Sequence, residues 1–217
     1  MAAYTSDDVS EAPGETGSRR VELASALLLG LAAIATAYAA YYSAIFGGNA
    51  IEGYTSSTTL TAQAADIYGD ANGQFNYDRG LFVQYASYLV AGDVPSADMF
   101  AQQFMDENLF ETVLWYNETG DEVTDPFDSE AGSPYALEEY EIGNDLTAQA
   151  DAAYEQAKID DDKGDRFDLA AVLLALSLFF GGIASVFKRR VPQLATLAVG
   201  TIGFVGGMVV IVTAAMS

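Results

Sequence analysis

The densest group of side chains able to do chemistry is the run Asp160-Asp161-Asp162-Lys163-Gly164-Asp165. Carboxylates are the oxygen ligands that Ca²⁺ and Mg²⁺ prefer, and an EF-hand loop needs Asp or Asn at positions 1, 3 and 5 and Gly at position 6. The run does not match this motif in either alignment. With Gly164 at position 6, position 1 is Ile159, and with Asp160 at position 1, position 6 is Asp165. We therefore predict a solvated charged linker. The alternative is a loose divalent-cation site formed by Asp160, Asp161, Asp162 and Asp165.

Composition limits the remaining chemistry. The chain has no His and no Cys, which excludes the usual zinc sites, histidine acid–base catalysis, thiol nucleophiles and disulfides. Paired carboxylates serve as acid and base in glycosidases, but such pairs arise by chance among the 25 acidic residues of segment 47–166. The acidic loop 121–130 has the same two interpretations as the run 160–165, a solvated loop or a loose divalent-cation site. Asn117-Glu118-Thr119 matches a glycosylation sequon, a short pattern that also occurs by chance. We predict no enzymatic activity and no cofactor.

Asp168 is the only ionisable residue in the apolar run 167–187. A carboxylate deep inside a membrane would indicate a proton or ion path. Because Asp168 stands at the edge of the run, two residues after Arg166, we expect it to face lipid headgroups or to pair with that arginine.

Small residues recur along two other apolar runs, and such stripes let helix backbones approach closely in lipid. The sequence leaves open packing within one chain, self-association into a homo-oligomer, or docking to another membrane protein. The small residues concerned are Ala32, Thr36, Ala40 and Ala44 in the first run, and Gly200, Gly203 and Gly207 in the third.

Three apolar runs must position these residues, at 21–46, 167–187 and 191–215. At about 1.5 Å per helical residue each can cross the ~30 Å hydrocarbon layer of a bilayer. We predict transmembrane helices at 21–46, 167–187 and 193–217, the last including a short C-terminus, with a basic turn at 188–192.

Basic residues cluster before the first run and between the second and third. Because loops rich in Lys and Arg stay in the cytoplasm, both clusters place segment 47–166 and the C-terminus outside it. We also expect residues 1–20 to be a disordered cytoplasmic tail, because they are polar and can bury little apolar surface. The residues that determine this topology are Arg19, Arg20, Lys188, Arg189 and Arg190.

Segment 47–166 carries 25 acidic and four basic residues, a net charge of −21 against −22 for the whole chain. Such a segment repels nucleic acids and anionic lipid headgroups. With only three lysines in the chain, the composition also suggests a high-salt habitat, although a GC-rich genome would produce part of it.

The same segment has helical periodicity. Tyr68, Phe75, Phe82 and Leu89 recur every seven residues, which lines one face of a long helix. Glycines in this stretch predict a break near 72–80. We expect a second helix at about 96–116, with Phe104 among its apolar residues, and a third that starts at Ser133-Pro134 and is interrupted at 143–145.

These features predict an all-α membrane protein with three transmembrane helices and an extracytoplasmic helical bundle inserted between the first and second. The segment order resembles that of bacterial chemoreceptor sensors in outline, except that a five-residue turn and a third span follow where a signalling segment would stand. Besides the lipid bilayer, the expected partners are a second copy of this chain or another membrane protein, with divalent cations as an alternative and no nucleic acid. We expect a structural, accessory or adaptor subunit. The alternatives are a sensor or a module binding a small ligand or cation, and an oligomeric channel or transporter subunit.

Overall fold

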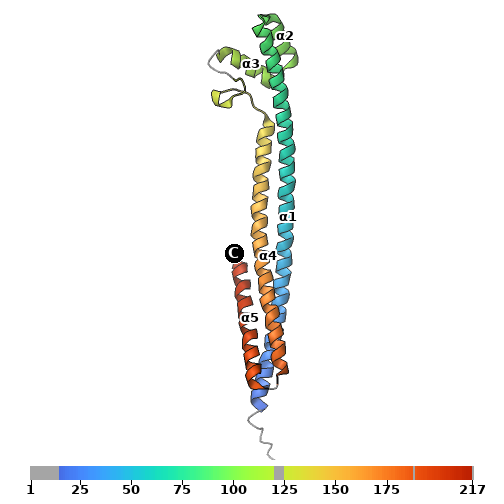
Figure 1. Cartoon of the computed structure of the whole chain (residues 1–217), viewed down its shortest axis with the longest axis vertical. Coiled ribbons are helices and arrows are strands. Elements are labelled where there is room, and N and C mark those ends of the chain that lie inside the picture. The colour runs from blue at the N-terminus through green and yellow to red at the C-terminus, as the bar shows by residue number, and fades with distance from the viewer. Residues whose placement is uncertain (1–14, 120–124, 188, 217) are drawn as a thin grey trace, which may run out of the picture. The chain divides into compact units, whose positions relative to one another are not determined.

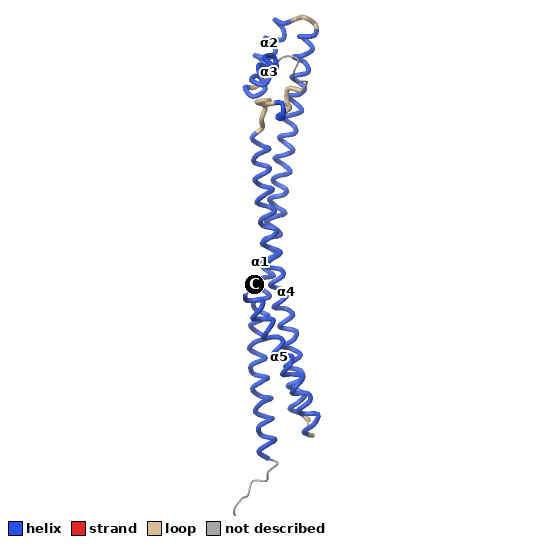
Figure 2. Tube along the Cα trace, turned by 90° about the vertical axis from the view of Figure 1, so that its left-hand side faces the viewer, coloured by secondary structure: helices blue, strands red, loops and turns tan. Residues whose placement is uncertain are grey.

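The computed structural model describes residues 15–119, 125–187 and 189–216, without the side chains of residues 15–20. Asp121, Glu122, Lys188 and most of the expected N-terminal tail therefore lie outside the described residues, as do the side chains of Arg19 and Arg20. The described residues are helical and contain no strand (Figures 1 and 2). The elements are α1 (Glu15–Val90), α2 (Val94–Phe104), α3 (Glu107–Thr119), the 3₁₀ helix η2 (Ser129–Ala131), α4 (Glu138–Val186) and α5 (Arg190–Met216).

The predicted all-α class is confirmed. Three helices of the described chain, α1, α4 and α5, are long and apolar enough to cross a membrane. The chain divides into two compact units. The first, here the span unit, comprises Met1–Tyr54 and Glu155–Ser217. The second, here the acidic unit, comprises Thr55–Tyr154.

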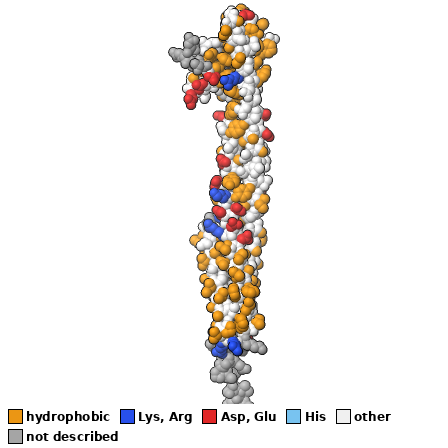
Figure 3. Space-filling view, in the orientation of Figure 1, with side chains coloured by type: hydrophobic (Ala, Val, Ile, Leu, Met, Phe, Trp, Pro, Cys, Tyr) orange, Lys and Arg blue, Asp and Glu red, His pale blue; other side chains and the backbone are white. Residues whose placement is uncertain are grey.

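In the span unit, α1 and α5 both pack against α4. Half of the core side chains are alanines, and small residues at the contacts let the helix backbones lie close together. A Cβ placed on Gly164 of α4 would lie 3.3 Å from the backbone nitrogen of Gly47 on α1. Figure 3 shows hydrophobic side chains over the surface of this unit, as a helix facing lipid requires. Its core residues are Ala39, Phe167, Ala170, Leu174, Ile211 and Ala214.

In the acidic unit, α1 runs antiparallel to α4, and α2 and α3 pack on the last turns of α1. Small or buried residues recur every seven positions on α1, at Ala64, Ala71, Asp78 and Tyr85. Gly143 and Ala150 continue the same spacing on α4. This seven-residue repeat gives the two helices coiled-coil-like packing. The core beneath α2 and α3 consists of Tyr85, Ala97, Ala101, Leu109 and Val113.

Several expected helix boundaries are wrong. The helix α1 begins at Glu15, inside the expected tail, and is unbroken through 72–80. The helix α4 begins at Glu138 instead of Ser133, and continues through 143–145. Glycine costs helix stability locally, but packing against a second helix supplies more stability than propensity removes.

Two further boundaries differ because of local backbone chemistry. The expected helix at 96–116 is two helices, and the Asp106 carboxylate accepts a hydrogen bond from the Leu109 amide at 2.8 Å, capping α3. The helix α5 begins at Arg190, so Pro192 lies in its first turn, where a missing amide proton is harmless.

Candidate functional site

The acidic run 160–165 is part of α4 and not a linker. Among the described residues, no group of three or more Asp or Glu side chains is placed to hold a metal ion. One member has a partner on the neighbouring helix, because the Tyr54 hydroxyl donates to Asp161 Oδ2 at 3.5 Å. Asp160, Asp161 and Asp162 are consecutive on a continuous helix and so point about 100° apart, and Asp165 lies on the same side of the helix as Asp161 and Asp162 only.

Asp168 has a partner that the sequence did not suggest. The Ser43 hydroxyl on α1 donates to Asp168 Oδ1 at 2.6 Å. The expectation named lipid headgroups or Arg166, because sequence distance gives no sign that residue 43 lies beside residue 168. This hydrogen bond gives the Asp168 carboxylate a partner on another helix of the span unit.

Aromatic rings surround that hydrogen bond. The Phe167 ring is buried and stacks on Phe46 with centroids 5.7 Å apart, and on Tyr42 at 5.6 Å. The Lys163 ammonium lies 5.8 Å from the Phe46 ring centroid, close enough for a cation–π contact. Tyr42 and Phe46 of α1 thus join this helix to α4 through the Phe167 ring.

The glycine stripe of α5 faces α4. A Cβ on Gly203 would lie 3.2 Å from the Leu173 carbonyl oxygen, and one on Gly207 would lie 2.7 Å from Leu174 Cγ. Gly200 lies equally close to the backbone of Ser177. All three glycines are thus used within the chain.

The small residues of α1 do not act as one stripe. Ala32 is fully buried, and the Thr36 hydroxyl donates back to the Ala32 carbonyl at 2.7 Å. Ala40 and Ala44 are exposed. The four-residue spacing drifts around a helix of 3.6 residues per turn, so the stripe leaves the helix contact after its first half.

In the acidic unit, tyrosine hydroxyls connect the elements. Tyr68 donates to Asn144 Oδ1 at 2.7 Å, and Tyr140 donates to Asn72 Oδ1 at 2.9 Å. The sequence analysis counted Tyr68 only as an apolar ring in the seven-residue repeat and did not single out Tyr140. Their para-hydroxyls add polar contacts that fix the register of α1 against α4.

Among the residues that the structure describes, Asp78 is the one charged side chain that is buried, at 1% exposure. Its carboxylate accepts hydrogen bonds from the Tyr135 hydroxyl at 2.7 Å and from Gln74 Nε2 at 2.9 Å. Burial and this hydrogen bond raise the pKa of Tyr135 well above its usual value. Two donors thus hold a buried carboxylate, and no pattern in the sequence marked it.

Asn117, the asparagine of the sequon, uses its side-chain amide in a hydrogen bond within the folded chain. Asn117 Nδ2 donates to the Tyr85 hydroxyl at 2.7 Å. Asn117 lies in the last turns of α3, so its amide links α3 to α1.

Partly buried aromatic side chains of the acidic unit pack ring against ring. The Phe127 ring lies 4.8 Å from Tyr135, 5.4 Å from Phe75 and 5.9 Å from Phe82, each in an edge-to-face arrangement. These four rings line no cavity described in this unit; a cavity of 310 Å³ is lined by residues of α2, α3 and the turn between them, including Met105.

Exposed apolar side chains lie at the end of α1 and along α2 (Figure 3). Val90 is 90% exposed and Met99 63%. Phe104, expected among the apolar core residues, is more than half exposed. This group, here the α2 apolar patch, consists of Val90, Val94, Met99 and Phe104. Their five-residue spacing places Val94, Met99 and Phe104 about 140° apart around α2, so they lie around this helix and not along one face of it.

Comparison of this chain with protein-family models, with curated proteins and with solved structures finds no match.

Proposed function

We propose that this chain is an integral membrane protein that acts as a non-enzymatic accessory or adaptor subunit through its acidic helical unit. In this proposal segment 47–166 lies outside the cytoplasm, and the basic residues around 19–20 and 188–190 lie inside it. The strong negative charge of segment 47–166 supports an aqueous location away from anionic headgroups.

The observation that carries the adaptor proposal is the α2 apolar patch. A ligand-binding sensor would use a cavity among the aromatic residues, whereas those rings pack against one another. Exposed apolar side chains on an otherwise acidic unit favour a protein partner that covers them.

The second candidate is a sensor, and the continuity of α1 supports it. This helix runs without interruption from Glu15 to Val90 and so contributes residues to both units. A change at one end of an unbroken helix can bias a partner at the other end, provided that the helix has two arrangements.

The topology underlying both candidates can be tested with single cysteines, because the chain has none of its own. Ser129 in η2 is exposed, so an impermeant maleimide should label Ser129→Cys in intact cells and should not label Ser6→Cys. Labelling of Ser6→Cys from outside would invert the topology. Gln193 is unsuitable as a third site because it is buried.

The adaptor role can be tested by affinity purification of the full chain from native membranes. Val90→Ser and Met99→Ser change exposed positions, where substitutions normally alter stability little. Each should reduce the amount of co-purified partner at least tenfold. Ile142→Ser, at an exposed apolar position on α4, is the matched control and should retain it. If all three variants co-purify the same amount of partner, the α2 apolar patch does not bind it.

A further inference from the structure

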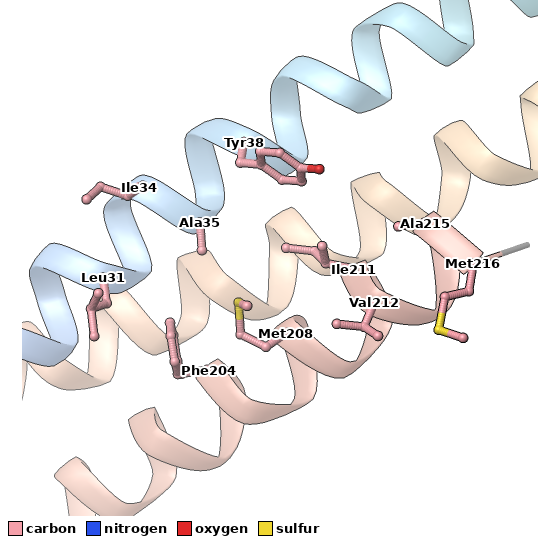
Figure 4. A pocket seen from close by; sticks show the side chains of 10 residues that line it. All are labelled: Leu31, Ile34, Ala35, Tyr38, Phe204, Met208, Ile211, Val212, Ala215 and Met216. Carbon is pink, nitrogen blue, oxygen red and sulfur yellow. The ribbon is translucent and has the colours of Figure 1, made fainter.

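An apolar groove of 540 Å³ lies in the span unit between α1 and α5. Figure 4 shows its lining side chains coming from both helices. Its walls include Leu31, Ile34 and Tyr38 of α1, and Phe204, Met208 and Val212 of α5.

The groove follows from the way the three helices pack. A Cβ on Gly200 would lie 3.2 Å from the Ser177 carbonyl on α4 and 3.5 Å from Leu28 on α1, so all three helices meet there. Further along, α5 stays on α4 through Gly207. The space between α1 and α5 is therefore left without a protein side chain to fill it, and Ile211 of the core lies in its lining.

The length and chemistry of the groove match one lipid hydrocarbon chain. Its α5 wall runs from Phe204 to Met216, about 18 Å at 1.5 Å per residue. One leaflet contributes about 15 Å to a ~30 Å hydrocarbon core. Every lining side chain is apolar except for the Tyr38 hydroxyl, so a polar ligand would leave its own groups unpaired.

A helix of a second copy fits this groove poorly. Helices approach in lipid over small residues, whereas only Ala35 and Ala215 are small here. Large side chains such as Ile34, 71% exposed, stand at the surface. The groove is also continuous with the exposed apolar surface of α1, α4 and α5, which in a membrane-spanning chain faces the bilayer.

We propose that this groove is a binding site for one hydrocarbon chain of a bilayer lipid. The chain enters from the leaflet at the Tyr38 and Met216 end, where the Tyr38 and Tyr42 rings lie 4.6 Å apart. Tyrosines favour the membrane–water interface, so the headgroup of the bound lipid lies at that level.

The test uses the full chain in phosphatidylcholine vesicles that contain a phospholipid with a photoactivated diazirine in its acyl chain. After illumination, mass spectrometry maps the labelled residues. We expect labelling of the groove residues Leu31, Tyr38, Phe204, Met208 and Val212 to exceed that of Val205 and Val209, exposed positions of α5 outside the groove lining, at least fivefold. Ala35→Trp fills the groove and should reduce the excess to background. Ala37→Trp, an exposed alanine on the same helix, should preserve it.

Other outcomes overturn the proposal in distinguishable ways. Equal labelling of all exposed apolar positions would mean ordinary contact with the bilayer and no site. Chain-to-chain cross-links through the groove would mean that a second copy fills it. Absence of labelling everywhere would contradict membrane insertion itself. If Ala35→Trp fails to fold, Ala215→Trp blocks the same groove from α5 and should give the same loss.

Discussion

Gly143 of α4 lies against the Tyr68 ring of α1 in the acidic unit. A Cβ at this position would lie 2.6 Å from Tyr68 Cε1, so Gly143→Ala must displace the ring and strain the Tyr68–Asn144 hydrogen bond. We expect a loss of about 1–3 kcal/mol in the free energy of unfolding of the full chain. The single tryptophan, Trp115 in α3, provides a fluorescence signal in this unit.

The matched control for this substitution is Gly69→Ala. Gly69 lies inside α1 with nothing within 4 Å of an added Cβ. Alanine there should therefore stabilise the helix by about 1 kcal/mol. Destabilisation by both variants to the same extent would show that the Gly143–Tyr68 contact is not the cause.

Tyr135 and Asp78 provide a second prediction at this scale. Tyr135→Phe removes one of the two donors to a carboxylate that is almost fully buried. Leaving a buried acceptor short of a partner costs about 1–3 kcal/mol, and denaturant unfolding at pH 7 should show this loss. Tyr140→Phe is the comparison, because its acceptor, Asn72, is exposed and can turn to water. An equal effect of both variants would contradict the special role of the buried carboxylate.

The same pair predicts a response to high pH. Burial first, and then the hydrogen bond to Asp78, raise the pKa of Tyr135 above its unfolded value of 10.0. Above pH 10 the unfolded state therefore loses a proton that the folded state keeps. The free energy of unfolding should fall with rising pH, by at most about 1.4 kcal/mol per pH unit from this residue. Below pH 10 the contribution is constant. The slope between pH 10 and 12 should be shallower in Tyr135→Phe, and an unchanged slope would contradict the assignment.

The sequence predicted the presence of the long helices better than the residues at which they begin, break or end. The seven-residue spacing of Tyr68, Phe75 and Phe82 identified a long helix, because a buried face must repeat with the helical period. The breaks expected at 72–80 and 143–145 are absent, because the cost of glycine is local and the packing of α1 against α4 decides the outcome.

The candidate contacts were less predictable than the helices. The glycine stripe of α5 marked a close approach, but a stripe does not name the helix that it meets, and here it meets α4. Ser43, the partner of Asp168, lies 125 residues away along the chain, and Tyr135, one of the two partners of Asp78, lies 57 residues away. Such pairs depend on the register between helices, which hydrophobic periodicity alone leaves undetermined.

At the scale of helices, the contact between α4 and α5 gives a testable prediction. A Cβ on Gly207 would clash with Leu174 Cγ at 2.7 Å, whereas one on Gly206 would meet only Leu173 Cδ1 at 3.9 Å. Gly207→Ala should therefore lower the unfolding temperature in detergent by several degrees, and Gly206→Ala should not. Light scattering should give an unchanged particle mass for both. A smaller particle for Gly207→Ala at unchanged stability would instead place this glycine between chains.

At the scale of the whole molecule, charge is the dominant feature. Nearly all of the net charge of −22 belongs to segment 47–166, while the apolar helices carry almost none. In the proposed topology the acidic surface meets water and the apolar surfaces meet lipid. Dispersed carboxylates of one sign keep such a unit soluble but oppose its compact state.

The last prediction concerns salt. At 0.01 M ionic strength the Debye length is about 30 Å, so most carboxylates of the acidic unit repel one another, whereas at 1 M it is about 3 Å and only neighbours interact. The free energy of unfolding, followed by Trp115 fluorescence, should therefore rise from 0.01 to 1 M NaCl. Because the described residues hold no group of three carboxylates placed around an ion, CaCl₂ and NaCl at equal ionic strength should stabilise the unit to a similar extent. A much larger effect of millimolar Ca²⁺ would demonstrate a specific cation site and would make the acidic surface a binding surface.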